Sequence, residues 1–184
     1  MTPVESERLR LREFTSGDID LLVELDSDPQ VMRFLTGEPT PRDEIANVVL
    51  PAMLKVYADH PGLGTFAAHE KGTRTFVGWF GLQPTDDAAT VDVGYRLLRS
   101  AWGNGYATEG TKTLIDYAFT ELSKDRVIAD TMAVNHRSRA VMRRSGLRFT
   151  RLWHEHFDDP LPGTEFGEVE YALDRHTWET RHRA

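Results

Sequence analysis

Two spacings of apolar residues alternate along the chain and predict a mixture of strands and helices. Apolar residues at every second position are typical of strands, because successive side chains point to opposite faces of a sheet. Apolar residues three or four positions apart are typical of helices, because these positions share one face. The pattern predicts strands over residues 8–12, 64–69, 75–82, 91–97 and 126–134. It predicts helices from Thr15 to Pro29, from Thr40 to Val56, after Thr108, and from Asn135 to Gly146.

Glycine and proline mark where these elements end. Lys71-Gly72-Thr73 separates two predicted strands and is typical of a hairpin turn. Pro51 lies inside the second predicted helix, where the missing N–H predicts a kink or a break. No repeat or linker divides the 184 residues, so we expect one domain, residues 1–184.

The composition is that of a globular protein, with 40% hydrophobic and 28% charged residues. The chain has no cysteine, which excludes a disulfide, a thiolate nucleophile and a cysteine-ligated metal cluster. Residues 1–14 lack the apolar core of a secretion signal, and no apolar run approaches the roughly 18 residues of a membrane span. We therefore expect a cytoplasmic protein without a membrane partner.

The formal net charge of −7 argues against nucleic acid as a partner, because binding to phosphates needs a basic surface. The charge is unevenly distributed, since residues 96–151 hold eleven Lys or Arg and five Asp or Glu within an acidic remainder. Two interpretations stay open. In the first, the basic segment 96–151 binds a polyanionic cofactor and the acidic remainder attracts a cationic substrate. In the second, the uneven charge is ordinary surface solvation.

A glycine-containing loop over residues 99–108 joins the predicted strand 91–97 to a helix. Small residues there let the backbone approach a ligand, and the free N–H groups of a helix N-terminus favour a phosphate or pyrophosphate. Gly103 and Gly105 fit neither the dinucleotide fingerprint nor the Walker loop. The alternative interpretation is a flexible entry into the helix.

A second polar cluster begins where the predicted strand 126–134 ends. Asn135 is placed to cap the next helix, and Ser138 then lies in its first turn. We expect at least one arginine of this helix to contact a phosphate, with a solvated face as the alternative. The helix carries four of them: Arg137, Arg139, Arg143 and Arg144.

His154 and His156 would share one face of a strand and form a metal pair. No third ligand is evident in the sequence, so we predict no metal site.

Several motifs occur together in a fixed order, and the chain resembles the GNAT N-acetyltransferases, in particular the branch of the ribosomal-protein N-terminal acetyltransferases. The resemblance spans about residues 5 to 178. It implies an α/β fold with a mixed, mostly antiparallel sheet of about seven strands, helices on both faces, and a splay between strands 4 and 5 that admits acetyl-CoA. The motifs are Glu7-Arg8-Leu9-x-Leu11-Arg12, Asp28-Pro29-x-Val31-Met32, Val93-Gly94-Tyr95, Trp102-Gly103-Asn104-Gly105-Tyr106-Ala107-Thr108-Glu109, Asn135-x-x-Ser138 and Gly146-Leu147-x-Phe149.

The resemblance assigns residues to acetyl-CoA, the implied co-substrate. The segment Trp102 to Ala107 matches the family's pyrophosphate loop, with Trp102 in the place of the usual Gln or Arg. The strand backbone at 96–99 matches the segment that pairs with the pantetheine arm, and Asn135 and Ser138 match positions at its end. The predicted cofactor-binding residues are Arg96, Leu97, Leu98, Arg99, Trp102, Gly103, Asn104, Gly105, Tyr106, Ala107, Thr108, Asn135, Ser138 and Arg143.

The implied chemistry is direct attack of a primary amine on the thioester in a ternary complex. Asp92 is the candidate base, although a carboxyl of ordinary pKa near ~3.9 is a poor base at neutral pH. Many family members use a tyrosine as the acid where this chain has Met142, which leaves either Ser138 as the candidate acid or no dedicated acid. Glu109 is expected to serve the helix end.

Two functions remain open at this stage: an N-acetyltransferase, or an acyl-CoA-binding sensor that has lost catalysis. The acceptor is a small-molecule or peptide amine that the sequence does not name, because acceptor pockets are built from variable segments, here about residues 30–60 and 158–168. The oligomeric state is equally hidden, although a homodimer is common in relatives.

Overall fold

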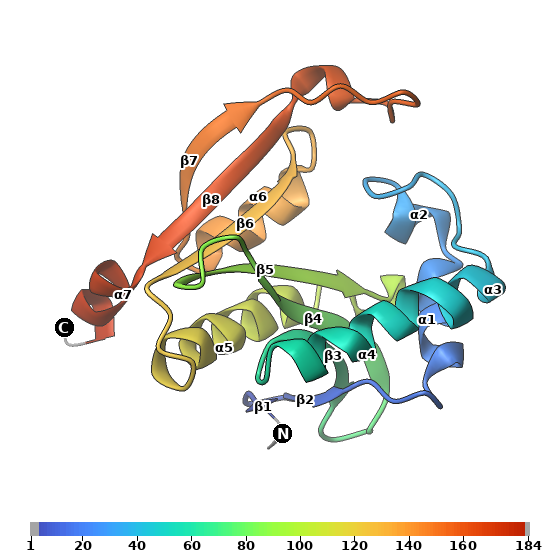
Figure 1. Cartoon of the computed structure of the whole chain (residues 1–184), viewed down its shortest axis with the longest axis horizontal. Helices are drawn as coiled ribbons and strands as arrows, with labels where there is room; N and C mark the ends of the chain where they lie inside the picture. Colours follow the sequence, from blue (N-terminus) through green and yellow to red (C-terminus); the bar gives the residue numbers. More distant parts are fainter. Residues whose placement is uncertain (1–3, 183–184) are drawn as a thin grey trace.

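The five strands that the sequence predicts join three further strands in one eight-stranded sheet, one more than the expected seven, in the computed structural model, which describes residues 4–182 (Figure 1). The order across the sheet is β1-β2-β3-β4-β5-β6-β8-β7, and every pair is antiparallel except β5 with β6. The strands are β1 (Val4–Glu5), β2 (Leu9–Glu13), β3 (Gly64–Glu70), β4 (Phe76–Pro84), β5 (Thr90–Leu97), β6 (Arg126–Met132), β7 (Arg148–Trp153) and β8 (Glu168–Asp174).

Helices cover both faces of this sheet, as expected (Figure 1). Those of the first sixty residues pack on one face of β2–β4, while α5 and α6 pack on the opposite face. The helices are α1 (Ile19–Asp26), α2 (Pro29–Met32), α3 (Arg42–Glu44), α4 (Leu50–Asp59), α5 (Tyr106–Thr120), α6 (His136–Arg144) and α7 (Arg175–His182), with short turns at Arg99–Ala101 and Thr164–Phe166.

Each face of the sheet has its own apolar core. Phe80 on β4 is fully buried against α5, and its ring would lie 2.3 Å from a Cβ at Gly110, so only glycine permits this approach. On the other face, Leu25 of α1 and Ile45 pack with Ala67 of β3. The two cores fix the helices on either side of the central strands.

The sheet opens between β5 and β6. These parallel strands pair only over Thr90, Val91 and Asp92, whose partners are residues 126–128. Beyond Asp92 no strand among residues 4–182 pairs with this edge of β5. The predicted splay is thus confirmed, and it lies between the fourth and fifth strands when counting starts at β2.

The structure corrects two local predictions. Pro51 does not break its helix, because a π-helical turn over Ile45–Val49 absorbs the missing donor and leads straight into α4. His154 and His156 are not on a strand, since β7 ends at Trp153, so the shared face expected for the two imidazoles does not exist.

Candidate functional site

The glycine loop forms an open cradle at the start of α5. Gly103 and Gly105 have φ angles of +79° and +83°, a conformation that glycine adopts without strain. A Cβ built on Gly103 meets no atom within 4 Å, so the space in front of this backbone is free. The unpaired N–H groups of the first turn and the helix dipole face outward from here. Because backbone donors and open space coincide, the loop fits a diphosphate.

Hydrogen bonds from distant segments hold this loop in place. The indole Nε1 of Trp102 donates to the carbonyl of Leu97 at 2.9 Å, and Arg8 donates to the carbonyl of Asn104 at 3.0 Å. Arg8 also pairs with Glu109 at 2.6 Å. Glu109, which the sequence assigned to the helix end, therefore also ties α5 to the N-terminal strands through Arg8. The sequence analysis missed this contact and the contribution of Arg8 to the loop.

The four arginines of α6 have different surroundings. The guanidinium of Arg137 lies over the ring of Trp102, 5.4 Å from its centroid, and so reaches the glycine loop from the other side of the splay. Arg139 and Arg143 each donate to the hydroxyl of Tyr171 at 3.3 Å. The structure thus brings Arg137 to the loop, while Arg143, nearly two turns along the helix, stays a prediction.

The start of α6 faces the open end of β5. Asn135 caps the helix, since its Oδ1 accepts the N–H of Ser138 at 3.2 Å, which confirms the predicted cap. The hydroxyl of Tyr95 contacts Ser138, and burial raises the pKa of this phenol although the hydrogen bond with Ser138 opposes the rise. Met142 is buried one turn further on. Ser138 and Tyr95 therefore supply the hydroxyl groups at this point of the splay.

Arg96 belongs to two parts of the site. Its backbone lies on the free edge of β5, where a linear ligand can pair like an added strand. Its side chain points to the opposite face from Tyr95 and donates to the buried Asp26 at 2.6 Å, above the ring of Trp79. The same residue thereby links the free edge to α1.

Asp92 is the last residue of β5 that pairs with β6, so its carboxyl lies at the point where the strands separate. Burial, together with the nearby carboxyl groups of Asp130 and Glu170, raises its pKa from 3.8 to about 7. A carboxyl with this pKa is an efficient proton acceptor at neutral pH. This finding removes the objection that an ordinary aspartate is too weak a base.

Three further carboxyl groups share this face of the sheet. Asp130 lies two residues beyond the partner of Asp92, and it pairs with Glu170 of β8, while Glu168 follows on the same face. Burial and mutual repulsion raise the pKa of Asp130, and that of Glu168 to about 6. Arg151 offsets part of this charge through a 2.8 Å contact with Glu170. The sequence analysis missed this cluster, although the alternation Glu168-Val169-Glu170 in a strand is its one local signal.

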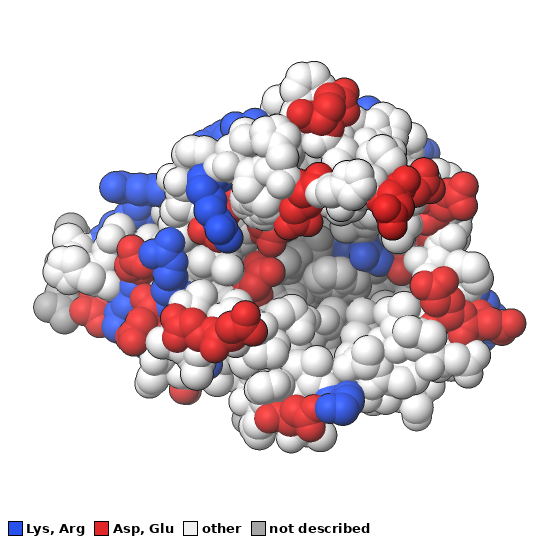
Figure 2. Space-filling model, turned by 45° about the horizontal axis from the view of Figure 1, so that its top comes forward, with Lys and Arg blue, Asp and Glu red and all other residues white. Residues whose placement is uncertain are grey.

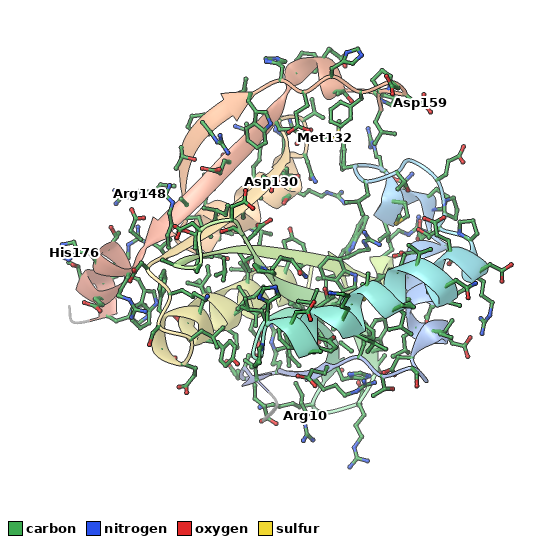
Figure 3. All side chains as sticks on the ribbon, viewed as in Figure 1. Arg10, Asp130, Met132, Arg148, Asp159 and His176 are labelled. Carbon is green, nitrogen blue, oxygen red and sulfur yellow. The ribbon has the colours of Figure 1, made fainter. Side chains whose placement is uncertain are left out.

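One face of the molecule is hollowed. Figure 2 shows this hollow in the middle of the face, with acidic side chains around it and a basic group inside. Figure 3 shows Asp130 on β6, above β5, at the place where the two strands diverge.

Comparison with known proteins identifies the family. The model of the acetyltransferase (GNAT) domain matches residues 8–148. The chain belongs to the GNAT acetyltransferase family. It is 36% identical over 176 residues to the FsC-acetyl coenzyme A-N(2)-transacetylase of Aspergillus fumigatus, a match that covers 91% of this chain and 71% of the relative.

Solved structures of GNAT enzymes share the fold. The spermidine N-acetyltransferase from Vibrio cholerae, in complex with CoA and spermine, has a TM-score of 0.76 at 16% identity, covering 94% of this chain and 98% of its own. The ribosomal L7/L12 alpha-N-protein acetyltransferase RimL, in complex with CoA, has a TM-score of 0.79 at 16% identity, covering 95% and 99%. Both likenesses show that the chain has the fold of these enzymes.

The family makes this protein an acyltransferase with acetyl-CoA as its co-substrate. The free edge of β5 and the open backbone at Gly103 fit the two parts of such a molecule, a linear arm and a diphosphate. None of the helices among residues 4–182 is long and apolar enough to cross a membrane.

Proposed function

We propose that this protein transfers an acetyl group from acetyl-CoA to a primary amine by direct attack in a ternary complex. The position of Asp92 at the splay, with a pKa of about 7, is the observation that carries the proposal. A covalent enzyme intermediate is unnecessary, because an amine attacks a thioester once it has lost its proton.

In this mechanism Asp92 accepts the proton of the attacking ammonium or amine, directly or through one water. The nitrogen forms a bond to the carbonyl carbon of the thioester, the carbon–sulfur bond breaks, and the thiolate takes a proton. Ser138 donates this proton and regains one from solvent, while Asp92 releases its proton to solvent, so the cycle closes. The contact with Tyr95 orients the Ser138 hydroxyl. Met142 has no proton to give, so these two hydroxyl groups replace the tyrosine that many relatives carry at that position.

The co-substrate contacts follow the predicted residues. The backbone at Arg96, Leu97, Leu98 and Arg99 pairs with the linear arm, the loop from Trp102 to Thr108 binds the diphosphate, and Asn135 and Ser138 lie at the reactive end. Arg143 is the sequence-based choice for a phosphate contact. We add Arg137, because its contact with Trp102 places a second cation beside the diphosphate.

The acceptor is a primary amine, from a protein N-terminus or a small molecule. The cluster of Asp92, Asp130, Glu168 and Glu170 favours an acceptor that arrives as a cation. The name of the 36% identical relative, an N(2)-transacetylase, supports a small-molecule amine.

Release of free CoA in the presence of a panel of amines tests this function. We expect turnover that falls by about 10²- to 10⁴-fold in Asp92→Asn, the usual range for loss of a general base. CoA binding without turnover on any amine would instead support the alternative, an acyl-CoA-binding sensor. Full activity in both Asp92→Asn and Ser138→Ala would refute the catalytic assignment and leave the co-substrate site intact.

Three broader expectations complete the proposal: residues 1–184 act as one domain, in the cytoplasm, as a homodimer. The edge strand β7 exposes Phe149 and Leu152, which are 53% and 48% accessible and give a second copy an apolar surface. Light scattering coupled to gel filtration measures the mass, and a monomer at micromolar concentration would exclude the dimer.

A further inference from the structure

A pocket lies between α5, the end of α6, and α7, and Asp92 is not among its lining residues. Its volume is about 280 Å³, which is larger than a single water or ion needs. Its walls contain four basic residues and one acidic residue, and three apolar side chains close the remaining side. The lining residues are Lys112, Ile115, Asp116, Arg144, Ser145, Gly146, Leu173, Trp178, Arg181 and His182.

The positive charges of this pocket are not neutralised by the chain. Neither Lys112 nor Arg144 forms an ion pair with any of residues 4–182. Asp116 is already occupied, since it accepts a hydrogen bond from Trp178 at 2.7 Å and lies 3.7 Å from His182. The three permanent cations therefore exceed the one carboxylate by two charges, which matches a dianion.

The backbone is shaped to let a third cation approach. Arg181 donates to the carbonyl of Gly146 at 2.8 Å, and a Cβ at Gly146 would lie 2.6 Å from the same guanidinium nitrogen. Gly146 has a φ of +95°, a backbone conformation that favours glycine here. The end of α6 thus holds the Arg181 side chain against the pocket.

A buried hydroxyl in the same wall lacks an acceptor. Ser145 is 6% exposed, and its Oγ has no hydrogen-bond partner among the residues that the structure describes. Buried hydroxyl groups in proteins are normally hydrogen-bonded.

We propose that this pocket binds a phosphate dianion through Lys112, Arg144 and Arg181. The apolar wall of Ile115, Leu173 and Trp178 leaves room for an organic group, so the natural ligand is a phosphomonoester. Two sources share this chemistry: a free phosphorylated metabolite, and the 3′-phosphate of CoA. Binding is measured without turnover, so the outcome does not depend on the proposed amine acetylation.

Titration with inorganic phosphate at constant ionic strength, against chloride, tests the site in the full chain. We expect saturable binding that weakens about tenfold in Lys112→Met and in Arg144→Met, since a hydrogen bond to a charged group contributes about this factor. Arg10→Met is the matched control, because it removes an exposed cation of β2, toward the opposite edge of the sheet from β8 (Figure 3). Thermal unfolding of each variant shows whether it is folded.

A comparison of CoA with dephospho-CoA separates the two sources. If inorganic phosphate binds as expected, and CoA and dephospho-CoA bind equally well both to the wild type and to the Lys112→Met/Arg144→Met double variant, the pocket takes a free phosphorylated ligand. A preference for CoA that disappears in the double variant assigns the pocket to the 3′-phosphate. The proposal is overturned if the wild type does not bind phosphate, or if both single variants bind it as well as the wild type does, and the ratio of CoA to dephospho-CoA affinity is also unchanged.

Discussion

Arg137 on α6 lies over the indole ring of Trp102, with its guanidinium carbon 5.4 Å from the ring centroid. The two residues belong to opposite sides of the splay, and the Trp102 indole is itself fixed by the carbonyl of Leu97 at 2.9 Å. A cation is thereby held beside the backbone that we assign to the diphosphate. The pair also joins α6 to the loop before a ligand arrives.

We expect Arg137→Ala to weaken CoA binding about five- to tenfold, because both a phosphate contact and a cation–π contact are lost. Isothermal titration with CoA measures the change. Arg143→Ala is the matched comparison, and we expect a smaller effect, since Arg143 already donates to Tyr171. Equal affinities of wild type and Arg137→Ala would show that Arg137 does not contact the co-substrate.

The pKa of Asp92 predicts the pH dependence of catalysis. Because Asp92 must be ionised to accept a proton, kcat/KM should rise with pH and level off above about 7. The pH profile of kcat/KM is measured with two acceptors whose amine pKa values differ, which separates this rise from the titration of the substrate. A rise that persists in Asp92→Asn belongs to another group.

The same shift predicts a change in stability. The folded protein holds a proton on Asp92 up to about pH 7, whereas the unfolded chain loses it near 3.8, so this group lowers the free energy of unfolding as pH rises between these values. Asp92→Asn has no group that titrates here, so it does not show this fall in the free energy of unfolding. Its melting temperature should equal that of the wild type near pH 4 and exceed it by at least ~2–4 °C at pH 8. A variant that is less stable at pH 8 would contradict the assignment.

Tyr95 acts in our mechanism as a positioning residue for Ser138. Tyr95→Phe should lower kcat about tenfold with little change in KM, and the double variant with Ser138→Ala should lose no more than Ser138→Ala alone. A purely structural role of Tyr95 would instead lower the melting temperature and leave the kcat of the folded enzyme unchanged.

The close approach of Gly110 to Phe80 gives a test of the core. We expect Gly110→Ala to destabilise the protein by about 1–3 kcal/mol, because a Cβ would lie 2.3 Å from the buried ring and overpacking outweighs the gain in helix propensity. Gly72→Ala in the hairpin turn is the control, since no atom lies within 4 Å of its Cβ position. Denaturant unfolding measures both.

The sequence predicted the features that depend on neighbouring residues. The cap at Asn135, the glycine loop and the hairpin at 71–73 each follow from a few adjacent positions, and all three were found. The cluster of Asp92, Asp130 and Glu170 was missed, because it depends on the register of three strands from distant parts of the chain.

Long-range contacts were hidden for the same reason. Arg8 and Glu109 are 101 positions apart, so no local pattern reports their contact. The π-helical turn before Pro51 has no local signal, and it contains Ile45, which packs with Leu25 of α1. Each motif that carried the family resemblance is local, which explains why the sequence proposes residues for the co-substrate and none for the acceptor.

The brief pairing of β5 with β6 has a mechanical consequence. Among residues 4–182, the strand pairing between β1–β5 and β6–β8 consists of three residue pairs. A linear ligand bonded along the remaining edge of β5 and touching α6 bridges the two halves, so the molecule stiffens across its middle as that ligand binds. Each catalytic cycle then alternates between a more flexible ligand-free sheet and a more rigid ligand-bound sheet. Amide hydrogen exchange at residues 93–97 should slow in the ligand-bound state.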